Sequence, residues 1–394
     1  SHQCRNFDKS SISCFLDISK NFSGLEKKLI YLDHHLSHTL TALPYSSIQN
    51  DICSIVIDGF GDRSTSSISK VNNLFNIQEI WSCEYPVSLG LFYSAITDYL
   101  GFQVNEGEYK VMGLAAFGDS NSEIAKKVYQ LVSWDNSSKR IVMDMSYFSY
   151  HVSPKESFSE KLINILGEPR NPFAQLLPEE SDFEYYANIA AGAQKAITDN
   201  LCHIFTFANS ITGSKRFLFS GGVASNSAAL DTLSRLEFVD EIIVPPSPGD
   251  AGCSIGAAYY AYLKSHNKSI KKLPKPNLFP SKFNSSRQKL LAKKIIKEKF
   301  KILANNYEDS ITKAVALLKK GEVIGTILND SETGPRALGN RSLICDGKSQ
   351  DAVKTLNSFI KNRSPFRPTA PCMKMSTAKK YYDLRPELMG CYRY

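Results

Sequence analysis

Two histidines four residues apart, His34 and His38 in the run HHLSH, are the first residues whose spacing could do chemistry. In a helix this spacing places both imidazoles on one face, which suits two ligands of one divalent metal ion. His35 points elsewhere. Because no glutamate stands between the two histidines as it does in HExxH, a zincin-type protease is disfavoured. Two ordinary surface or core histidines would give the same pattern, so the motif alone does not decide.

Two aspartates could complete such a site. Asp58 ends the apolar run DICSIVID, and Asp250 lies in the segment PPSPGDAG ahead of a predicted helix. A mixed set of imidazole and carboxylate ligands suits iron, zinc or manganese. Asp250 could instead cap the helix that follows it, and one carboxylate does not easily do both.

Two glycine-containing segments could contact a nucleotide. The segment SGGVASN at 220–226 joins a predicted strand to a helix, so its glycines allow close approach and the helix offers free N–H groups to an anion. It is neither GxGxxG nor a Walker A loop, and a tight turn explains it as well. In the segment 107–118, Glu108 could accept hydrogen bonds from ribose hydroxyls, and Lys110 could meet a phosphate or carbonyl oxygen. Alone, that segment is only a polar loop.

Four arginines stand in Gly- and Pro-rich turns near the end of the chain. Arg336 and Arg341 lie in GPRALGNRS, and Arg363 and Arg367 lie in RSPFRP. The planar guanidinium group matches phosphate and carboxylate oxygens with two parallel hydrogen bonds. Ion pairing at the surface is the alternative explanation. Arginines in rigid turns support that explanation less than arginines in a stripe along a helix would.

The elements that must position these residues follow an α/β order. A strand, a Gly-rich turn and a helix recur along the chain, which places ligand sites at strand ends. We predict strands at 28–33, 51–58, 64–71, 217–219, 241–244, 299–304 and 323–329. We predict helices at 34–43, 88–100, 122–134, 183–209, from 226, and at 253–263, 287–297 and 308–319, and a turn and loop at 107–118.

Length and composition set the class of protein. A chain of 394 residues with 42% hydrophobic and 22% charged residues is typical of a soluble protein of two domains. The sequence contains no run of 18 apolar residues, and because no basic segment followed by an apolar one opens it, we expect no signal peptide in the part shown. Nine cysteines without a CxxC pair disfavour a disulfide framework and a zinc ribbon, so we expect a cytoplasmic protein.

The net charge of +8 is local. Residues 264–301 carry 13 Lys and Arg against one acid, a net of +12, and the remainder has a net charge of −4. This stretch also contains three prolines, which indicates a solvated linker at about 264–286 and a basic helix face. A nucleic-acid partner is therefore disfavoured, as is a membrane.

As an ordered set, seven segments resemble the O-carbamoyltransferases of the NodU/CmcH/TobZ type over about residues 28–372. They are HHLSH, YPVSLGLFYSAITDYLGF, NEGEYKVMGLAAFG, SGGVASNS, PPSPGDAG, GPRALGNRS and SPFRPTAP. The resemblance implies an α/β protein with an actin/Hsp70-like (ASKHA) domain over 1–270, which transfers the carbamoyl group. It implies a YrdC-like domain over 271–394, which forms carbamoyl-adenylate from ATP and carbamoyl phosphate.

The resemblance also implies a role for each candidate residue. His34, His38 and Asp250 match metal ligands, with Asp58 as a looser match, and iron(II) is favoured over zinc or manganese. The resemblance implies that the carbamoyl-transfer step takes place at His38, Asp58 and Lys110. Lys110 would lie near the carbamoyl-adenylate, and Asp58 is a candidate base. The implied nucleotide and anion contacts are Glu108, Gly221, Gly222, Asn226, Arg336, Asn340, Arg341, Ser342, Arg363 and Arg367.

The chain departs from the family pattern in two ways. We expect about 80 further residues before its start and more after Tyr394, and Asn329-Asp330 replaces the usual Gly-Arg, which removes positive charge near a phosphate site. These departures leave open a fragment, a subunit completed by a partner, or a non-catalytic member that binds a nucleotide or partner. A tRNA threonylcarbamoyl-type transferase is a further alternative. The expected acceptor is a small-molecule or sugar hydroxyl, and a homodimer is a reasonable assembly.

Overall fold

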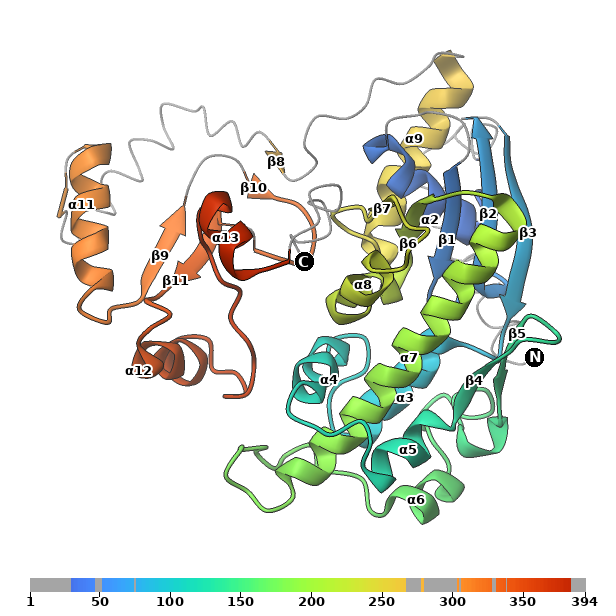
Figure 1. Cartoon of the computed structure of the whole chain (residues 1–394), viewed down its shortest axis with the longest axis horizontal. Coiled ribbons are helices and arrows are strands. Elements are labelled where there is room, and N and C mark those ends of the chain that lie inside the picture. The colour runs from blue at the N-terminus through green and yellow to red at the C-terminus, as the bar shows by residue number, and fades with distance from the viewer. Residues whose placement is uncertain are drawn as a thin grey trace, which may run out of the picture. The chain divides into compact units, whose positions relative to one another are not determined.

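The computed structural model describes residues 30–46, 52–73, 76–266, 278–279, 303–304, 306–327, 331–337 and 339–383. The candidate residues of the N-terminal part of the chain lie around a five-stranded sheet in the order β3-β2-β1-β6-β7 (Figure 1). The first three strands in the chain form an antiparallel meander, whereas β1, β6 and β7 run parallel. The strands are β1 (Ile52–Ile57), β2 (Ser64–Asn73), β3 (Asn76–Glu84), β6 (Arg216–Ser220) and β7 (Glu241–Ile243).

Both faces of β1 are buried, because helices cover the sheet on two sides. Cys53, Ile55 and Ile57 join the core formed with α3 and α7, and Figure 1 shows α7 (green) as a long helix running diagonally across the view. The residues between them face the other way, since Ser54 Oγ lies 2.8 Å from Thr39 Oγ1 of α2. The fold is therefore a layered α/β arrangement, as the sequence indicates. The helices are α2 (His34–Ala42), α3 (Leu89–Tyr99), α7 (Phe183–Thr212), α8 (Ser227–Ser234) and α9 (Cys253–His266).

Helices α2 and α9 pack closely because small residues line their contact. A Cβ atom on Gly256 would lie 2.1 Å from the carbonyl oxygen of Ser37. Ser37 Oγ donates to the carbonyl oxygen of Cys253 at 3.0 Å, and Thr41 Oγ1 donates to that of Gly252 at 2.9 Å. The start of α9 is thus held against the helix that carries the two histidines.

The expected hairpin and most of the expected helices are confirmed, but three expectations are wrong. Residues 107–118 contain helix α4 (Glu108–Ala115) instead of a loop, because Val111 and Leu114 bury one face of the helix against the core. Gly107 and Gly118 lie outside the helix, one before its start and one after its end. Residues 30–33 form no strand. The expected helix at 122–134 stops at Tyr129. The elements here are α5 (Glu123–Tyr129), β4 (Val132–Asp135), β5 (Arg140–Met143) and α6 (Glu160–Leu166).

The hairpin of β4 and β5 explains the short α5. Trp134 pairs with Ile141, and its ring lies 5.9 Å from that of Trp81 and 5.7 Å from that of Phe207. Burial of Val132 and this aromatic cluster favours a strand over one more helical turn.

The C-terminal region contains short helices and two-stranded sheets. Strands β9 and β11 pair antiparallel, as do β8 and β10. The expected helix at 308–319 and the described part of the expected strand at 323–329 are confirmed. The expected domain boundary at 270, the helix at 287–297 and most of the strand at 299–304 lie outside the described residues. The elements are β8 (Leu278–Phe279), α11 (Tyr307–Leu318), β9 (Ile324–Ile327), β10 (Ser331–Glu332), β11 (Arg341–Ile344), α12 (Gln350–Lys354), a π-helix (Thr355–Ile360) and α13 (Met375–Tyr381).

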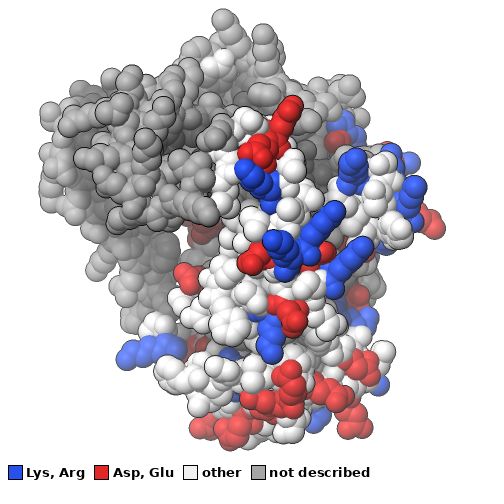
Figure 2. All heavy atoms as spheres, turned by 90° about the vertical axis from the view of Figure 1, so that its left-hand side faces the viewer, with Lys and Arg blue, Asp and Glu red and all other residues white. Residues whose placement is uncertain are grey.

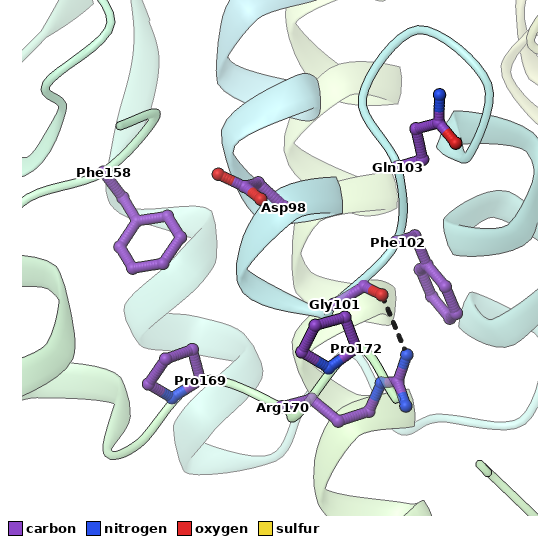
Figure 3. Close-up of a pocket in the computed structure, with 8 residues that line it drawn as sticks. All are labelled: Asp98, Gly101, Phe102, Gln103, Phe158, Pro169, Arg170 and Pro172. Atoms are coloured by element: carbon purple, nitrogen blue, oxygen red, sulfur yellow. Dashed lines mark hydrogen bonds between the residues drawn. The ribbon is translucent and has the colours of Figure 1, made fainter. Parts of the chain in front are cut away.

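Arg170 ties a loop to the end of α3. Its guanidinium donates to the carbonyl oxygens of Leu100, Gly101, Asn171 and Ala174, at 2.5 to 3.1 Å. Figure 3 shows it at the edge of a hollow of about 390 Å³ that contains none of the candidate site residues. The geometry explains this arginine as a structural clamp.

Replacing Arg170 with methionine is expected to lower the free energy of unfolding by about 3 kcal/mol, because one buried and three partly buried carbonyl groups lose their donor. Urea unfolding measures this loss. The exposed Arg140 provides a matched control, since Arg140→Met is expected to change the unfolding free energy by no more than about 0.5 kcal/mol. Equal unfolding midpoints for the two variants would contradict the clamp.

Charges are unevenly distributed over the described part of the face in Figure 2. Figure 2 shows Lys and Arg side chains gathered in the middle of one face and Asp and Glu side chains along its lower edge. Most of the basic stretch 264–301 lies outside the described residues, so its role stays a prediction. Six cysteines in the described part of the chain are free thiols. Of the helices described, none has the length and apolar character needed to cross a membrane.

Candidate metal centre

His34 and His38 lie on one face of α2, as their spacing predicts. Their Nε2 atoms are 3.1 Å apart, and the two rings meet nearly edge to face. The His38 side chain is fully buried, whereas that of His34 is 23% exposed. The helix therefore presents two imidazole nitrogens to one point, one from the interior and one near the surface.

Asp58 and Asp250 converge on the same point. Asp58 Oδ2 lies 3.1 Å from His34 Nε2 and 3.0 Å from His38 Nε2. Asp250 Oδ1 lies 3.3 Å and 3.4 Å from the same two atoms. Gly249, not Asp250, occupies the cap position of the short 3₁₀ helix Asp250–Gly252. The Asp250 carboxylate is directed at the two histidines, and its role as a ligand stays a prediction.

Backbone groups orient the Asp58 carboxylate. Its Oδ1 accepts hydrogen bonds from the amides of Gly59 at 2.9 Å and Gly222 at 3.1 Å, which leaves Oδ2 directed at the histidines. Gly221 has φ of +90°, and a Cβ atom there would lie 2.2 Å from the carbonyl oxygen of Ile57. The glycines of SGGVASN therefore let the loop approach the end of β1 and hold Asp58 in place.

The four groups shift one another's pKa. Hydrogen bonds with Asp250 and Asp58 raise the pKa of His34 to about 10. Burial lowers the pKa of His38, but hydrogen bonds with the same two carboxylates outweigh it and raise that pKa to about 11. Burial raises the pKa of Asp58, yet the histidines bring it well below its usual range, and they also lower that of Asp250. The site thus stabilises positive charge between its two carboxylates.

The donor set fits a divalent metal ion. With bonds of about 2.1 Å, neighbouring N and O ligands lie about 3.0 Å apart in an octahedral site and about 3.4 Å apart in a tetrahedral one. The four groups show separations of 3.0 to 3.4 Å. Ligand atoms of His34, His38, Asp250 and Cys253 also lie within 4.8 Å of one another. Imidazole and carboxylate donors are compatible with iron, zinc or manganese.

The residues expected to contact a nucleotide make hydrogen bonds within the chain. Asn226 Oδ1 accepts from the Ala229 amide at 3.1 Å and so caps α8, and its amide group pairs with that of Gln194 at 3.0 Å. Glu108 Oε1 accepts from Ser94 Oγ at 2.8 Å and from the Asn105 amide at 2.9 Å. These contacts stabilise the turn and the helix starts, whatever ligand binds there.

Lys110 and Arg367 lie against aromatic rings. Lys110 Nζ is 5.4 Å from the centre of the Phe102 ring. The Arg367 guanidinium is 4.1 Å from the centre of the Tyr109 ring and donates to Tyr109 Oη at 3.1 Å. Arg363 Nε donates to Asn357 Oδ1 at 2.7 Å.

The turn that contains Asn340 and Arg341 is closed by its own polar groups. The Glu332 carboxylate accepts from the amides of Asn340 at 2.9 Å and Arg341 at 3.1 Å. Ser342 Oγ accepts from the Gly339 amide at 3.0 Å, and Arg341 Nη1 donates to the carbonyl oxygen of Asn340 at 3.0 Å. Arg336 lies half-buried in a bend of the same segment. These contacts explain the fixed shape of the turn.

Two family models match the chain, and they follow one another along it. The carbamoyltransferase N-terminus model matches residues 8–259, and the carbamoyltransferase C-terminus model matches residues 315–392. The chain belongs to the carbamoyltransferase family. This confirms the resemblance that the ordered motifs indicate.

Two relatives are longer than the chain. An uncharacterized protein of Synechocystis, sll1178, is 31% identical over 90% of this chain and 57% of its own length. The nodulation protein NolNO of Sinorhizobium fredii is 29% identical over 91% of this chain and 49% of its own length. The chain thus spans about half the length of these two relatives.

A solved structure of full-length HypF, in a phosphate- and nucleotide-bound form, is 16% identical with a TM-score of 0.32. The match covers 61% of this chain and 37% of that one. A likeness at this TM-score supports no conclusion about this carbamoyltransferase-family chain.

Two contributions to the centre are not evident from the sequence. The thiol of Cys253 lies 3.6 Å from His38 Nε2, and the Gly222 amide binds Asp58 Oδ1. The one signal for Cys253 is its position three residues after Asp250, because residues three apart share a face at the start of a helix.

Proposed function

We propose that this chain takes part in carbamoyl transfer from carbamoyl phosphate, through carbamoyl-adenylate made with ATP, to a hydroxyl of a small-molecule or sugar acceptor. The observation that carries the proposal is the convergence of two imidazoles and two carboxylates at one point, in a chain that belongs to the carbamoyltransferase family. We further propose an actin/Hsp70-like architecture for 1–270 and a YrdC-like architecture for 271–394.

His34, His38, Asp58 and Asp250 would hold a divalent ion, for which iron(II) is our first choice. Bound there, the ion would supply Lewis acidity to the carbamoyl oxygen. Asp58 is better suited to ligation than to the role of base, because its Oδ1 is occupied by two amides and its pKa is held low. Lys110 would contact the carbamoyl-adenylate.

A cluster of cations, Lys361, Arg363 and Arg367, supports an anion site in the C-terminal region. Burial lowers the pKa of Lys361 and of Arg363, and the charge of nearby Arg367 lowers both further. Among the residues described, no carboxylate forms an ion pair with Arg363 or Arg367. A phosphate group of ATP or carbamoyl phosphate would offset this repulsion and accept paired hydrogen bonds.

Exchange between ATP and pyrophosphate, measured with and without carbamoyl phosphate in the presence of iron(II), tests the proposed function. Exchange that depends on carbamoyl phosphate is the expected result. A folded sample that shows no exchange under either condition would contradict formation of carbamoyl-adenylate by this chain. It would favour a family member that binds a nucleotide or a partner without turnover.

Replacing Arg367 with alanine is expected to raise the KM for carbamoyl phosphate about tenfold or more, because a charge-assisted hydrogen bond contributes about 1.5–3 kcal/mol. The exchange assay at varied carbamoyl phosphate measures this effect. Arg235 is the matched control, since it pairs with Asp231 on α8 and Arg235→Ala should leave the KM unchanged. An unaltered KM in the Arg367 variant would refute its role in anion binding.

A further inference from the structure

We propose that Cys253 supplies a sulfur ligand to the centre formed by His34, His38, Asp58 and Asp250, and that this thiol sets which divalent ion the centre prefers. The inference rests on the proposed metal role of those four residues and extends it to a residue of a different ligand class. Cys253 is the first residue of α9, and the sequence motifs assign it no role.

The sulfur atom lies close enough to the centre for its side chain to reach a shared ion. Cys253 Sγ lies 3.6 Å from both ring nitrogens of His38. An ion about 2.3 Å from sulfur and about 2.1 Å from nitrogen, in tetrahedral geometry, would separate the two ligand atoms by about 3.6 Å. The sulfur also lies within 4.8 Å of the ligand atoms of His34 and Asp250. The 3.6 Å to Nε2 is the separation that a shared ion requires, whereas the equal distance to Nδ1 places the sulfur beside the ring. Ligation therefore requires the Cys253 side chain to turn about its Cα–Cβ bond toward the ion.

The backbone around Cys253 keeps the thiol at this position. The Cys253 carbonyl oxygen accepts a hydrogen bond from Ser37 Oγ, one residue before His38. One turn later, Gly256 meets the Ser37 carbonyl so closely that a Cβ atom there would lie 2.1 Å from it. On the N-terminal side, the Gly252 carbonyl is bound by Thr41 at 2.9 Å. Three close contacts with α2 thus hold the first turn of α9 beside His38.

The chemistry of sulfur gives this position a consequence for metal choice. Thiolate is a soft ligand that favours zinc, iron and cobalt, whereas carboxylate and imidazole alone also accept manganese. Two histidines and two aspartates would discriminate weakly among these ions. Addition of Cys253 shifts the preference of the centre away from manganese.

Cobalt(II) titration of the intact protein in the absence of oxygen tests the proposal, because a cobalt–thiolate bond absorbs in the near ultraviolet. We expect this absorption in the wild-type protein and its loss in Cys253→Ser and Cys253→Ala, with the visible cobalt bands retained. Cys202→Ser, at a half-buried cysteine of α7, is the matched control and should keep the absorption. The preference for zinc over manganese should fall about tenfold or more in the Cys253 variants alone.

The outcomes distinguish failure of the Cys253 role from failure of the four-residue metal site. Visible cobalt bands in the wild-type protein without the near-ultraviolet absorption would overturn the role of Cys253 and leave the four-residue site intact. An unchanged zinc-to-manganese preference in a folded Cys253→Ala variant would overturn it as well. If cobalt binding to the wild-type protein matches that of His38→Ala, the proposed site itself fails, and with it the role of the thiol. The wild-type spectrum gives a result even where a variant does not fold.

Discussion

Replacing His38 with alanine is expected to weaken divalent-metal binding about a hundredfold, because loss of one of four ligands removes about 3 kcal/mol of binding free energy. His38 is the most buried of the four candidate ligands, and its Nε2 lies within 3.4 Å of the ligand atoms of the other three. Calorimetric titration with zinc measures the affinity. Under the proposed function, the variant should also lose carbamoyl transfer while it retains exchange between ATP and pyrophosphate.

The exposed His203 on α7 gives the matched control. His203→Ala should bind zinc with wild-type affinity and leave both half-reactions unaltered. Wild-type zinc affinity in a folded His38→Ala protein would contradict its role as a ligand. Equal loss of exchange and transfer would contradict the division of the two half-reactions between separate sites.

The sequence predicts the four candidate N and O ligands, which lie together in the structure, because each one follows from local pattern. Helical periodicity places His34 and His38 on one face, and an apolar run that ends in a carboxylate places Asp58 at the end of a strand. Asp250 follows a turn rich in proline and glycine, whose rigidity marks a fixed position. Such signals extend over only a few residues, so they can be recognised in the sequence without knowledge of the tertiary fold.

The surroundings of these ligands depend on contacts between distant segments. Cys253 meets His38 only because α9 packs on α2 through Ser37 and Gly256, more than 200 residues apart in the chain. Likewise, Gly222 supports Asp58 because β6 pairs with β1 in parallel. Neither pairing can be predicted from either segment alone, which is why the sequence indicates the candidate ligands and misses the contacts that hold them in place.

Local propensity misleads at the segment 107–118. Three glycines there predict a loop, yet Glu108–Ala115 is helical. Val111 and Leu114 are fully buried, and the tertiary contacts that they make outweigh the helix cost of Gly113, about 1 kcal/mol. In the same way, Asn226 and Glu108 follow the family pattern, but their hydrogen-bond partners Gln194 and Ser94 come from other helices.

Replacing Gly221 with alanine is expected to lower the free energy of unfolding by about 3 kcal/mol, the sum of left-handed backbone strain and a steric clash. The added Cβ atom would lie 2.2 Å from the carbonyl oxygen of Ile57, so the loop must move away from the end of β1. Because the next residue, Gly222, donates its amide to Asp58, the same movement should weaken zinc binding in the folded variant.

Gly213 gives a control with a positive φ and no steric clash, although its ψ of 0° differs from the 163° of Gly221. It also has a positive φ, +70°, but an added Cβ atom there would meet no heavy atom within 4 Å. Gly213→Ala should therefore lose only the strain, about 1 kcal/mol, and bind zinc as the wild type does. Urea unfolding and calorimetric zinc titration of the two variants compare the effects directly. If both variants lose the same stability and bind zinc equally well, the loop absorbs the extra atom and does not position Asp58. A larger loss of both stability and zinc affinity in Gly221→Ala alone would show that the glycine turn after β6 keeps the Asp58 carboxylate directed at the two histidines.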